Sequence, residues 1–241
     1  MKWITGIWLL ALGGWFVGCG PVAEIPRPIS DSVKVGLLMH YAMDGNNKDL
    51  AGNNPDLQVV GATIKPSVRE GKPNEVATYF NGTRANYAAL PITNNIAVNG
   101  ALSIAFWAKE SGPGLYSPRV FELWPGNYGP GFYWFNWYQG KIKWAGPDWE
   151  IQPKQVFDRN KWYHFVVTHD VNAIRIYVNG ELISKINLLG SIPPAAIKLP
   201  KFGEIGRMAQ KDGDAFEGAV RDFRIYNRTI SYNEVNYLYN Q

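Results

Sequence analysis

Residues 162–181 read WYHFVVTHDVNAIRIYVNGE and contain two short segments with the composition of β-strands. Trp162–His169 and Ile174–Val178 are rich in β-branched and aromatic residues, which favour strands over helices. A polar turn at residues 170–173 separates them, and Asn179-Gly180 follows the second, a dipeptide typical of tight β-hairpins. This region therefore predicts antiparallel strands joined by short turns.

The same organisation extends outward along the chain. In Ala101–Lys109, alternate residues form two sets that would point to opposite faces of a β-strand. The dipeptide Gln139-Gly140 marks a turn between residues 132–138 and residues 141–144. The sequence predicts one short helix, at the C-terminus, where Ser231 precedes Glu234 by the spacing of a capping box. Many short strands and frequent turns indicate an all-β protein, a sandwich of two antiparallel sheets.

Composition narrows the class of protein. The formal charge is 24 − 20 = +4 with no concentrated block of Lys and Arg, which argues against a nucleic-acid-binding surface. Hydrophobic residues at 46% exclude intrinsic disorder. A chain of 241 residues is close to the upper size for one hydrophobic core, so one domain is expected.

The N-terminus has the features of an export signal. Lys2 precedes an apolar run, Ile4–Val17, that is too short to span a bilayer. Phe16-Val17-Gly18-Cys19 resembles a bacterial lipobox, which implies lipidation of Cys19, the only cysteine. The alternative is an ordinary cleaved signal or an uncleaved anchor with a chance cysteine.

The lipobox interpretation divides the chain into three parts. Residues 1–18 are a signal peptide, residues 19–34 are a Pro-rich tether, and residues 35–241 are the folded domain. Resemblance to lipoproteins of bacteria with two membranes implies a lipid-anchored protein of the cell envelope. Gly20 is not acidic, which favours the outer membrane or the cell surface over retention at the inner membrane.

Several segments together resemble a known family, in order along residues 36–240. They are Gly36–Asn46, Asp49–Asn53, Phe80–Gly82, Leu102–Lys109, Trp162–Thr168, Ile176–Glu181 and Phe216–Arg228. The set looks like the laminin-G-like, concanavalin A-like lectin/glucanase domains. The resemblance implies a jelly-roll sandwich with about a dozen strands. Such domains serve as lectins, hydrolases, lyases or adhesive modules, so the fold alone does not assign a function.

Catalytic patterns are weak in this sequence. Glucanases of this fold carry an E-x-D-x-x-E strand that places two carboxylates across the scissile bond, and the chain lacks that motif. The nearest acidic pair is Asp148 and Glu150, which leaves a hydrolase or lyase as a minor alternative. His164 and His169 are five residues apart on one strand, so they point to opposite faces and form no metal pair. The sequence favours a protein that is not an enzyme.

Aromatic residues are concentrated between Trp124 and Trp149, where ten occur in 26 positions. On the strand at residues 132–138, aromatic residues occur at both odd and even positions. Alternate residues point to opposite faces of a strand, so one of these two sets of rings must face away from the core. Exposed rings edged by polar groups suit the flat C–H faces and hydroxyls of sugars. The residues expected to bind carbohydrate are Tyr128, Trp134, Asn136, Trp137, Tyr138, Trp144, Asp148 and Trp149. Alternatively, the rings fill the core or form an interface with a cell-surface protein.

A structural calcium ion is a second expectation. Asp44, Asn46 and Asp49 are close in one short loop, and such oxygen ligands suit a hard cation. The family resemblance implies that this loop meets the closing strand near Asp222. Alternatively, Asp44-Gly45-Asn46 forms a turn through backbone hydrogen bonds.

Overall fold

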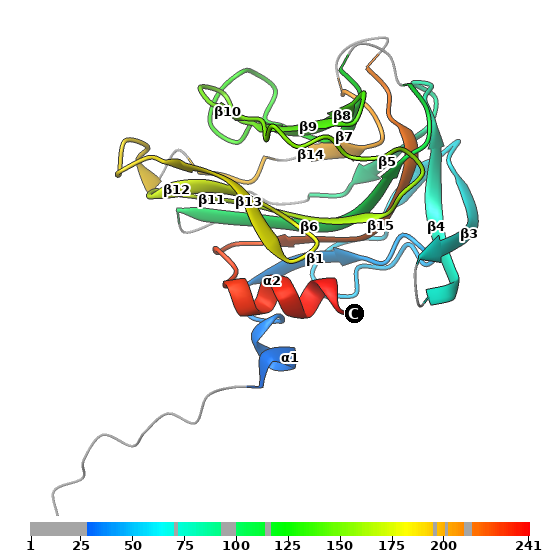
Figure 1. The fold of residues 1–241 in the computed structure, drawn as a ribbon, viewed down its shortest axis with the longest axis horizontal. Helices are drawn as coiled ribbons and strands as arrows, with labels where there is room; N and C mark the ends of the chain where they lie inside the picture. Colours follow the sequence, from blue (N-terminus) through cyan, green and yellow to red (C-terminus); the bar gives the residue numbers. More distant parts are fainter. Residues whose placement is uncertain are drawn as a thin grey trace, which may run out of the picture.

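The computed structural model describes residues 28–69, 72–92, 100–113, 117–194, 197–200, 202–209 and 214–241, and within them the chain forms a two-sheet sandwich (Figure 1). The elements in chain order are α1 (Ile29–Ser32), β1 (Leu37–Tyr41), β2 (Gln58–Val60), β3 (Thr63–Arg69), β4 (Lys72–Asn81), β5 (Tyr87–Leu90), β6 (Ala101–Glu110), β7 (Arg119–Trp124), β8 (Tyr133–Tyr138), β9 (Lys141–Ala145), β10 (Glu150–Ile151), β11 (Tyr163–Asp170), β12 (Ala173–Val178), β13 (Glu181–Asn187), β14 (Phe202–Ile205), β15 (Glu217–Tyr226) and α2 (Tyr232–Tyr239).

The strands form two antiparallel sheets. One has eight strands in the order β13-β12-β11-β6-β15-β4-β3, with β1 also paired to β15. The other has seven strands in the order β10-β9-β8-β7-β14-β5-β2. The predicted all-β sandwich of two antiparallel sheets with a short C-terminal helix is confirmed.

Both predicted hairpin turns form. At Asn179-Gly180 the two φ angles are 49° and 88°, and at Gln139-Gly140 they are 52° and 75°. Positive φ at both central residues is the geometry of a type I′ turn, whose twist matches that of paired strands. Gly180 is required for a second reason, because a Cβ there would lie 2.5 Å from Asn236 Oδ1 of α2.

The main core lies between the sheets and is built on aromatic rings. Phe106 of β6 packs against Phe165 and Phe223 of its own sheet, at centroid distances of 5.5 and 5.9 Å. The same ring meets Phe121 and Phe135 of the opposite sheet at 5.5 and 5.2 Å. These mostly tilted or edge-to-face contacts between large rings stabilise the sandwich through burial and ring geometry.

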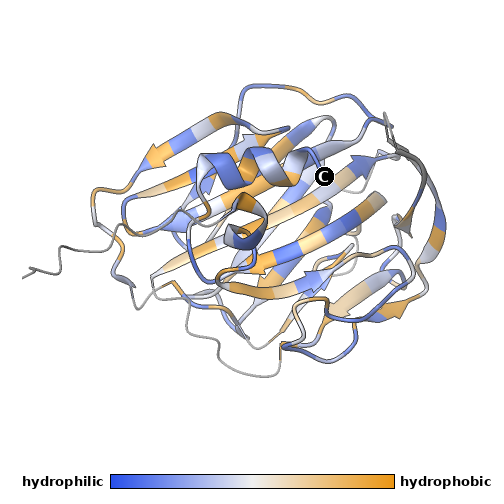
Figure 2. Ribbon diagram, turned by 90° about the horizontal axis from the view of Figure 1, so that it is seen from below, coloured by the Kyte–Doolittle hydropathy of each residue, from blue (hydrophilic) through white to orange (hydrophobic). Residues whose placement is uncertain are grey.

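Helix α2 covers the outer face of the eight-stranded sheet, as Figure 2 shows from below. Val235 and Leu238 of α2 are buried against residues such as Ala105 and Val166, in a second apolar cluster. The predicted capping box is present: Ser231 Oγ accepts a hydrogen bond from the Glu234 N–H, and the Glu234 carboxylate accepts one from the Ser231 N–H. The short C-terminal helix is thus placed by its cap and its apolar side.

The folded domain begins earlier than predicted. Val33, assigned to the tether, is buried in the same apolar cluster as α2. Arg228 donates hydrogen bonds to the carbonyl oxygens of Ser32 and Val35 and to the Glu234 carboxylate. The tether boundary at residue 34 is therefore wrong, because helix α1 and the residue after it pack onto the sandwich.

The signal peptide, Cys19 and most of the tether lie outside the described residues. Within the part that the structure describes, neither helix has the length and apolar character needed to cross a bilayer.

Candidate functional site

Strand β8 divides its side chains between the core and the outside. Tyr133, Phe135 and Trp137 face the core, whereas Trp134, Asn136 and Tyr138 lie on the outer face of the seven-stranded sheet. This split confirms that only one parity looks away from the core.

Trp137 and Trp144 are core residues with exposed fractions of 0% and 1%. Trp137 packs edge-to-face on Tyr163 and Phe165, with centroids 5.7 and 5.3 Å apart. Trp144 stacks on Tyr133 at 5.4 Å. The expectation that these two indoles contact a sugar is wrong, because both are buried in the main core.

Trp134 lies on the outer face, but two cationic side chains lie over its ring. The Arg119 guanidinium lies 3.8 Å from the ring centroid, and the Lys143 ammonium lies 5.8 Å from it. Arg119 in turn pairs with the buried Glu122 at 3.4 Å. Burial lowers the pKa of Arg119 and raises that of Glu122, while each charge favours the other's ionised form. Trp134 is therefore part of a packed ionic network and not an open stacking platform.

A groove of about 330 Å³ lies beside this network, on the outer face of the same sheet. Asn136 Nδ2 donates to Ser117 Oγ at 2.7 Å, and Gln139 Nε2 donates to Tyr138 Oη at 2.9 Å. We name this hollow the sheet-face groove, and it is lined by Ser117, Asn136, Tyr138, Gln139, Lys141, Ile142, Lys143 and Gln152. Amides, hydroxyls and ammonium groups dominate it, and the ring of Tyr138 is its only aromatic surface.

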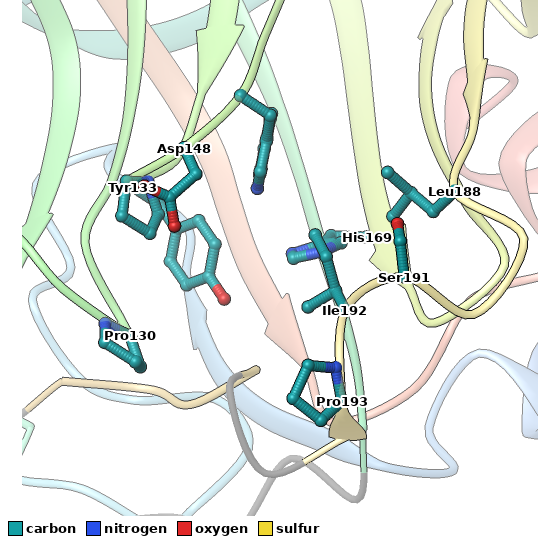
Figure 3. A pocket seen from close by; sticks show the side chains of 10 residues that line it. Pro130, Tyr133, Asp148, His169, Leu188, Ser191, Ile192 and Pro193 are labelled. Atoms are coloured by element: carbon teal, nitrogen blue, oxygen red, sulfur yellow. The ribbon is translucent and has the colours of Figure 1, made fainter.

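A second hollow, of about 370 Å³, lies at the rim of the sandwich (Figure 3). Tyr133 and Asp148 stand on one side of it, and Leu188, Ser191 and Ile192 stand on the other. We name it the rim pocket, and it is lined by Pro130, Tyr133, Pro147, Asp148, Trp149, His169, Leu188, Ser191, Ile192 and Pro193. It joins four segments that are distant in sequence.

His169 is the unusual residue of the rim pocket. Its ring lies 4.9 Å from that of Trp149 and 5.8 Å from that of Tyr133, both edge-to-face. Burial lowers the pKa of His169 to about 4, against a small opposing effect of Asp170. The imidazole is therefore neutral at pH 7. His164 lies on the other face of β11, where it packs against Trp107, so the predicted separation of the two histidines is confirmed.

The other residues predicted to bind carbohydrate or to act as an acidic pair lie at separate places on the surface. Tyr128 is 65% exposed and packs edge-to-face on Trp124 and Phe132, but it lines neither hollow. Asp148 lines the rim pocket, while Glu150 pairs with Lys143 of the sheet-face groove at 3.0 Å. The two carboxylates thus belong to different surfaces.

The opening loop is held together by its own hydrogen bonds. Asp44 accepts one from the Asn46 N–H at 3.0 Å, and Gly45 between them has a φ of 96°. The turn interpretation of these residues is confirmed. The Asp49 carboxylate accepts from the backbone N–H groups of His40, Ala51, Asn53 and Asn54.

The Asp222 carboxylate is likewise taken up by hydrogen bonds from neighbouring side chains. His40 donates to its carboxylate at 2.6 Å and Arg224 at 3.0 Å. Burial alone would raise the pKa of Asp222, but these two partners outweigh it and hold the pKa well below its ordinary range. No cluster of three or more His, Cys, Asp or Glu side chains suited to a metal occurs among the described residues. The predicted ligand set of Asp44, Asn46, Asp49 and Asp222 does not fit calcium. These residues form no such cluster, the Asp49 carboxylate is taken up by backbone N–H groups, and the Asp222 carboxylate is taken up by His40 and Arg224.

Sequence reasoning missed most of the rim pocket. It identified Asp148 and Trp149 but not Tyr133, His169 or the segment at residues 188–193. A histidine on the apolar parity of β11 was the available signal, since core positions rarely carry a polar ring without a reason.

Comparison with solved structures shows the fold. The binding domain of Paraclostridial Mosquitocidal Protein 1 superposes with a TM-score of 0.68 at 17% identity, covering 86% of this chain and 52% of that one. Domain 4 of the GH43 extracellular arabinanase AbnA from Geobacillus stearothermophilus, solved with arabinotriose, gives 0.61 at 15% identity, covering 84% and 97%. A botulinum neurotoxin type C structure, whose title describes cell entry through two ganglioside molecules, gives 0.66 at 18% identity, covering 88% and 52%.

This chain therefore spans about half the length of the two toxin chains and nearly all of the arabinanase domain. The mosquitocidal protein structure is described as a binding domain, and the arabinanase structure is one domain of an enzyme. A search of curated proteins finds no match. The family model described as the concanavalin A-like lectin/glucanases superfamily matches residues 74–236, more than half of the sequence. The chain belongs to that superfamily.

Proposed function

We propose that this protein is a non-catalytic, lectin-like domain that is anchored in the bacterial cell envelope and binds carbohydrate at the outer face of its seven-stranded sheet. The sheet-face groove carries this proposal. Its amides, hydroxyls and ammonium groups offer both donors and acceptors to sugar hydroxyls, and Tyr138 offers a ring for stacking.

The polarity of the groove favours a glycan over a protein partner. Protein interfaces are centred on apolar and aromatic residues that lose their water on binding. In the groove only Ile142 and the Tyr138 ring are apolar, and Ile142 is buried. The arabinotriose and gangliosides in the titles of two structural relatives support the same class of ligand.

The position of the groove suits an anchored protein. Helix α1, where the described chain begins, packs with α2 on the outer side of the eight-stranded sheet. The groove lies on the opposite side of the sandwich (Figure 1). A lipid on Cys19 would therefore leave the groove directed away from the membrane.

Polysaccharide pull-down and a glycan array test the proposal, using the chain from Gly20 onward, which keeps every described residue. We expect binding to at least one glycan, weakened about tenfold or more by Tyr138→Ala and unchanged by Tyr128→Ala, since Tyr128 lies outside the groove. Absence of glycan binding, or equal binding by both variants, would contradict it.

The anchor has its own test. Metabolic labelling with a palmitate analogue should mark the wild-type protein and not Cys19→Ala, while the domain remains folded in both. No label on the wild type, or equal label on the variant, would reject lipidation and leave the glycan-binding proposal intact.

A further inference from the structure

His169 is a buried polar group whose hydrogen bonds are missing. The residue is only 2% exposed, and neither ring nitrogen has a partner among the described residues. Buried polar atoms in native proteins nearly always have a hydrogen-bond partner, because water is lost on burial and must be replaced. The two nitrogens therefore call for a donor and an acceptor that the described chain does not supply.

The surroundings of His169 are those of a ligand site. The ring borders a hollow of about 370 Å³, within the range of small-molecule pockets. Aromatic walls come from Tyr133 and Trp149, and polar groups at the opening come from Asp148 and Ser191. An apolar lining with a few converging polar groups is the usual composition of a site that orients a small ligand.

We infer that the rim pocket is a second binding site, which takes one uncharged, hydroxyl-bearing ring such as a single sugar residue, with a ligand hydroxyl hydrogen-bonded to His169. This goes beyond the proposed function, since the rim pocket shares no residue with the sheet-face groove. Apart from the buried Ile142, the groove residues lie on the outer side of the sheet, whereas Tyr133 lies in the core between the sheets and His169 packs against it.

The charge of the ligand follows from the groups around the hollow. A neutral imidazole has one donor and one acceptor, and a hydroxyl group can pair with either. An anionic ligand would meet the Asp148 carboxylate and would need a protonated His169, which burial opposes. A cation would have to give up its water against an uncharged floor with no second carboxylate among the lining residues.

The test monitors the three histidines of the chain directly. The protein from Gly20 onward, labelled with ¹³C at histidine Cε1, is titrated with the methyl glycosides of glucose, galactose and arabinose at pH 7. We expect at least one glycoside to give a saturable shift of the His169 resonance, with those of His40 and His164 unmoved. Glucuronate and choline serve as the anionic and cationic probes and should bind at least tenfold more weakly.

Two variants locate the site. His169→Phe keeps the bulk of the ring but removes both nitrogens, so glycoside affinity should fall at least tenfold. Ile192→Trp enlarges a partly buried side chain that lines the pocket, so it should also block binding while leaving β11 unaltered. In this variant the His169 resonance remains as the reporter.

The outcomes separate the two sites. Tyr138→Ala should spare glycoside binding at the rim pocket, and Ile192→Trp should spare polysaccharide binding at the groove. The inference is overturned if no glycoside shifts His169, if glycosides still bind to Ile192→Trp, or if glucuronate or choline binds as tightly as the glycosides.

Discussion

The outer faces of the two sheets differ in what covers them. The face of the eight-stranded sheet carries residues such as Ala105, Val166 and Tyr226, and helix α2 closes over it with Val235 and Leu238. The corresponding face of the seven-stranded sheet carries amides, ion pairs and partly exposed rings, and it bears the sheet-face groove. An apolar face is covered by the chain itself, while a polar one can remain open to a ligand.

The largest effect is expected from removing an apolar contact on the covered face. Leu238→Ala should lower the free energy of unfolding by about 3 kcal/mol, because the buried side chain leaves a cavity. The matched change on the open face, Tyr138→Ala, should cost less than about 1 kcal/mol, since the ring is partly exposed. Urea unfolding measures both. Equal losses in the two variants would show that α2 does not stabilise its face through packing.

Acid should destabilise the folded protein through His169 on strand β11. The pKa of His169 is lowered to about 4 from an ordinary value of 6.5. The unfolded chain therefore takes up a proton before the folded chain as the pH falls. At about 1.4 kcal/mol per pKa unit, stability should drop by about 3 kcal/mol between pH 6.5 and pH 4, and this contribution should level off below that range.

Replacing the imidazole checks that assignment. His169→Phe cannot be protonated, so its stability should vary less between pH 6.5 and pH 4 than that of the wild type. Chemical denaturation at several pH values measures the difference. An unchanged pH profile in the variant would assign the acid sensitivity to another group.

The cap of α2 should contribute less. Burial works against the charged form of Glu234, but Arg228, Ser32 and Ser231 outweigh it and lower its pKa to about 2. Glu234→Gln should destabilise the protein by about 2 kcal/mol at pH 7, with the difference shrinking as the pH falls from about 4.5 towards 2. Glu150→Gln, which breaks an exposed pair with Lys143, should cost no more than about 0.5 kcal/mol. Similar losses in the two variants would contradict a structural role for the cap.

The smallest effect concerns ligand affinity and not folding. Gln152→Ala removes one polar group from the sheet-face groove and should weaken glycan binding by about 1 kcal/mol, roughly fivefold. Unfolding should stay within about 0.5 kcal/mol of the wild type, since changes at such surface positions rarely alter stability. Isothermal titration calorimetry measures the affinity, and an unchanged Kd would place the glycan elsewhere on the sheet.

Local features of the sequence were sufficient for much of the fold. Asn179-Gly180 and Gln139-Gly140 form the expected hairpin turns, and Ser231 with Glu234 forms the expected capping box. The positions of five strands followed from composition and alternation, namely β6, β8, β9, β11 and β12. These features act between residues that are close in the chain, so they can be read without knowing how the sheets pack.

Tertiary packing decided the roles of the aromatic residues. Alternation showed that β8 has two faces, but not which of them is buried. The Phe165 and Tyr163 rings of the opposite sheet pack against Trp137 and make its side of β8 the core. This packing removed Trp137 from the predicted binding surface, and burial beside Tyr133 and Phe121 removed Trp144.

The rim pocket depended on tertiary structure in the same way. It joins Tyr133, residues 147–149, His169 and residues 188–193, which lie in separate parts of the sequence. The sequence by itself determined that β11 carries histidines on both faces. Only the folded chain decided that His164 packs against Tyr239 of the C-terminal helix while His169 borders a hollow. A pocket depends on distances between segments that have no fixed separation along the chain.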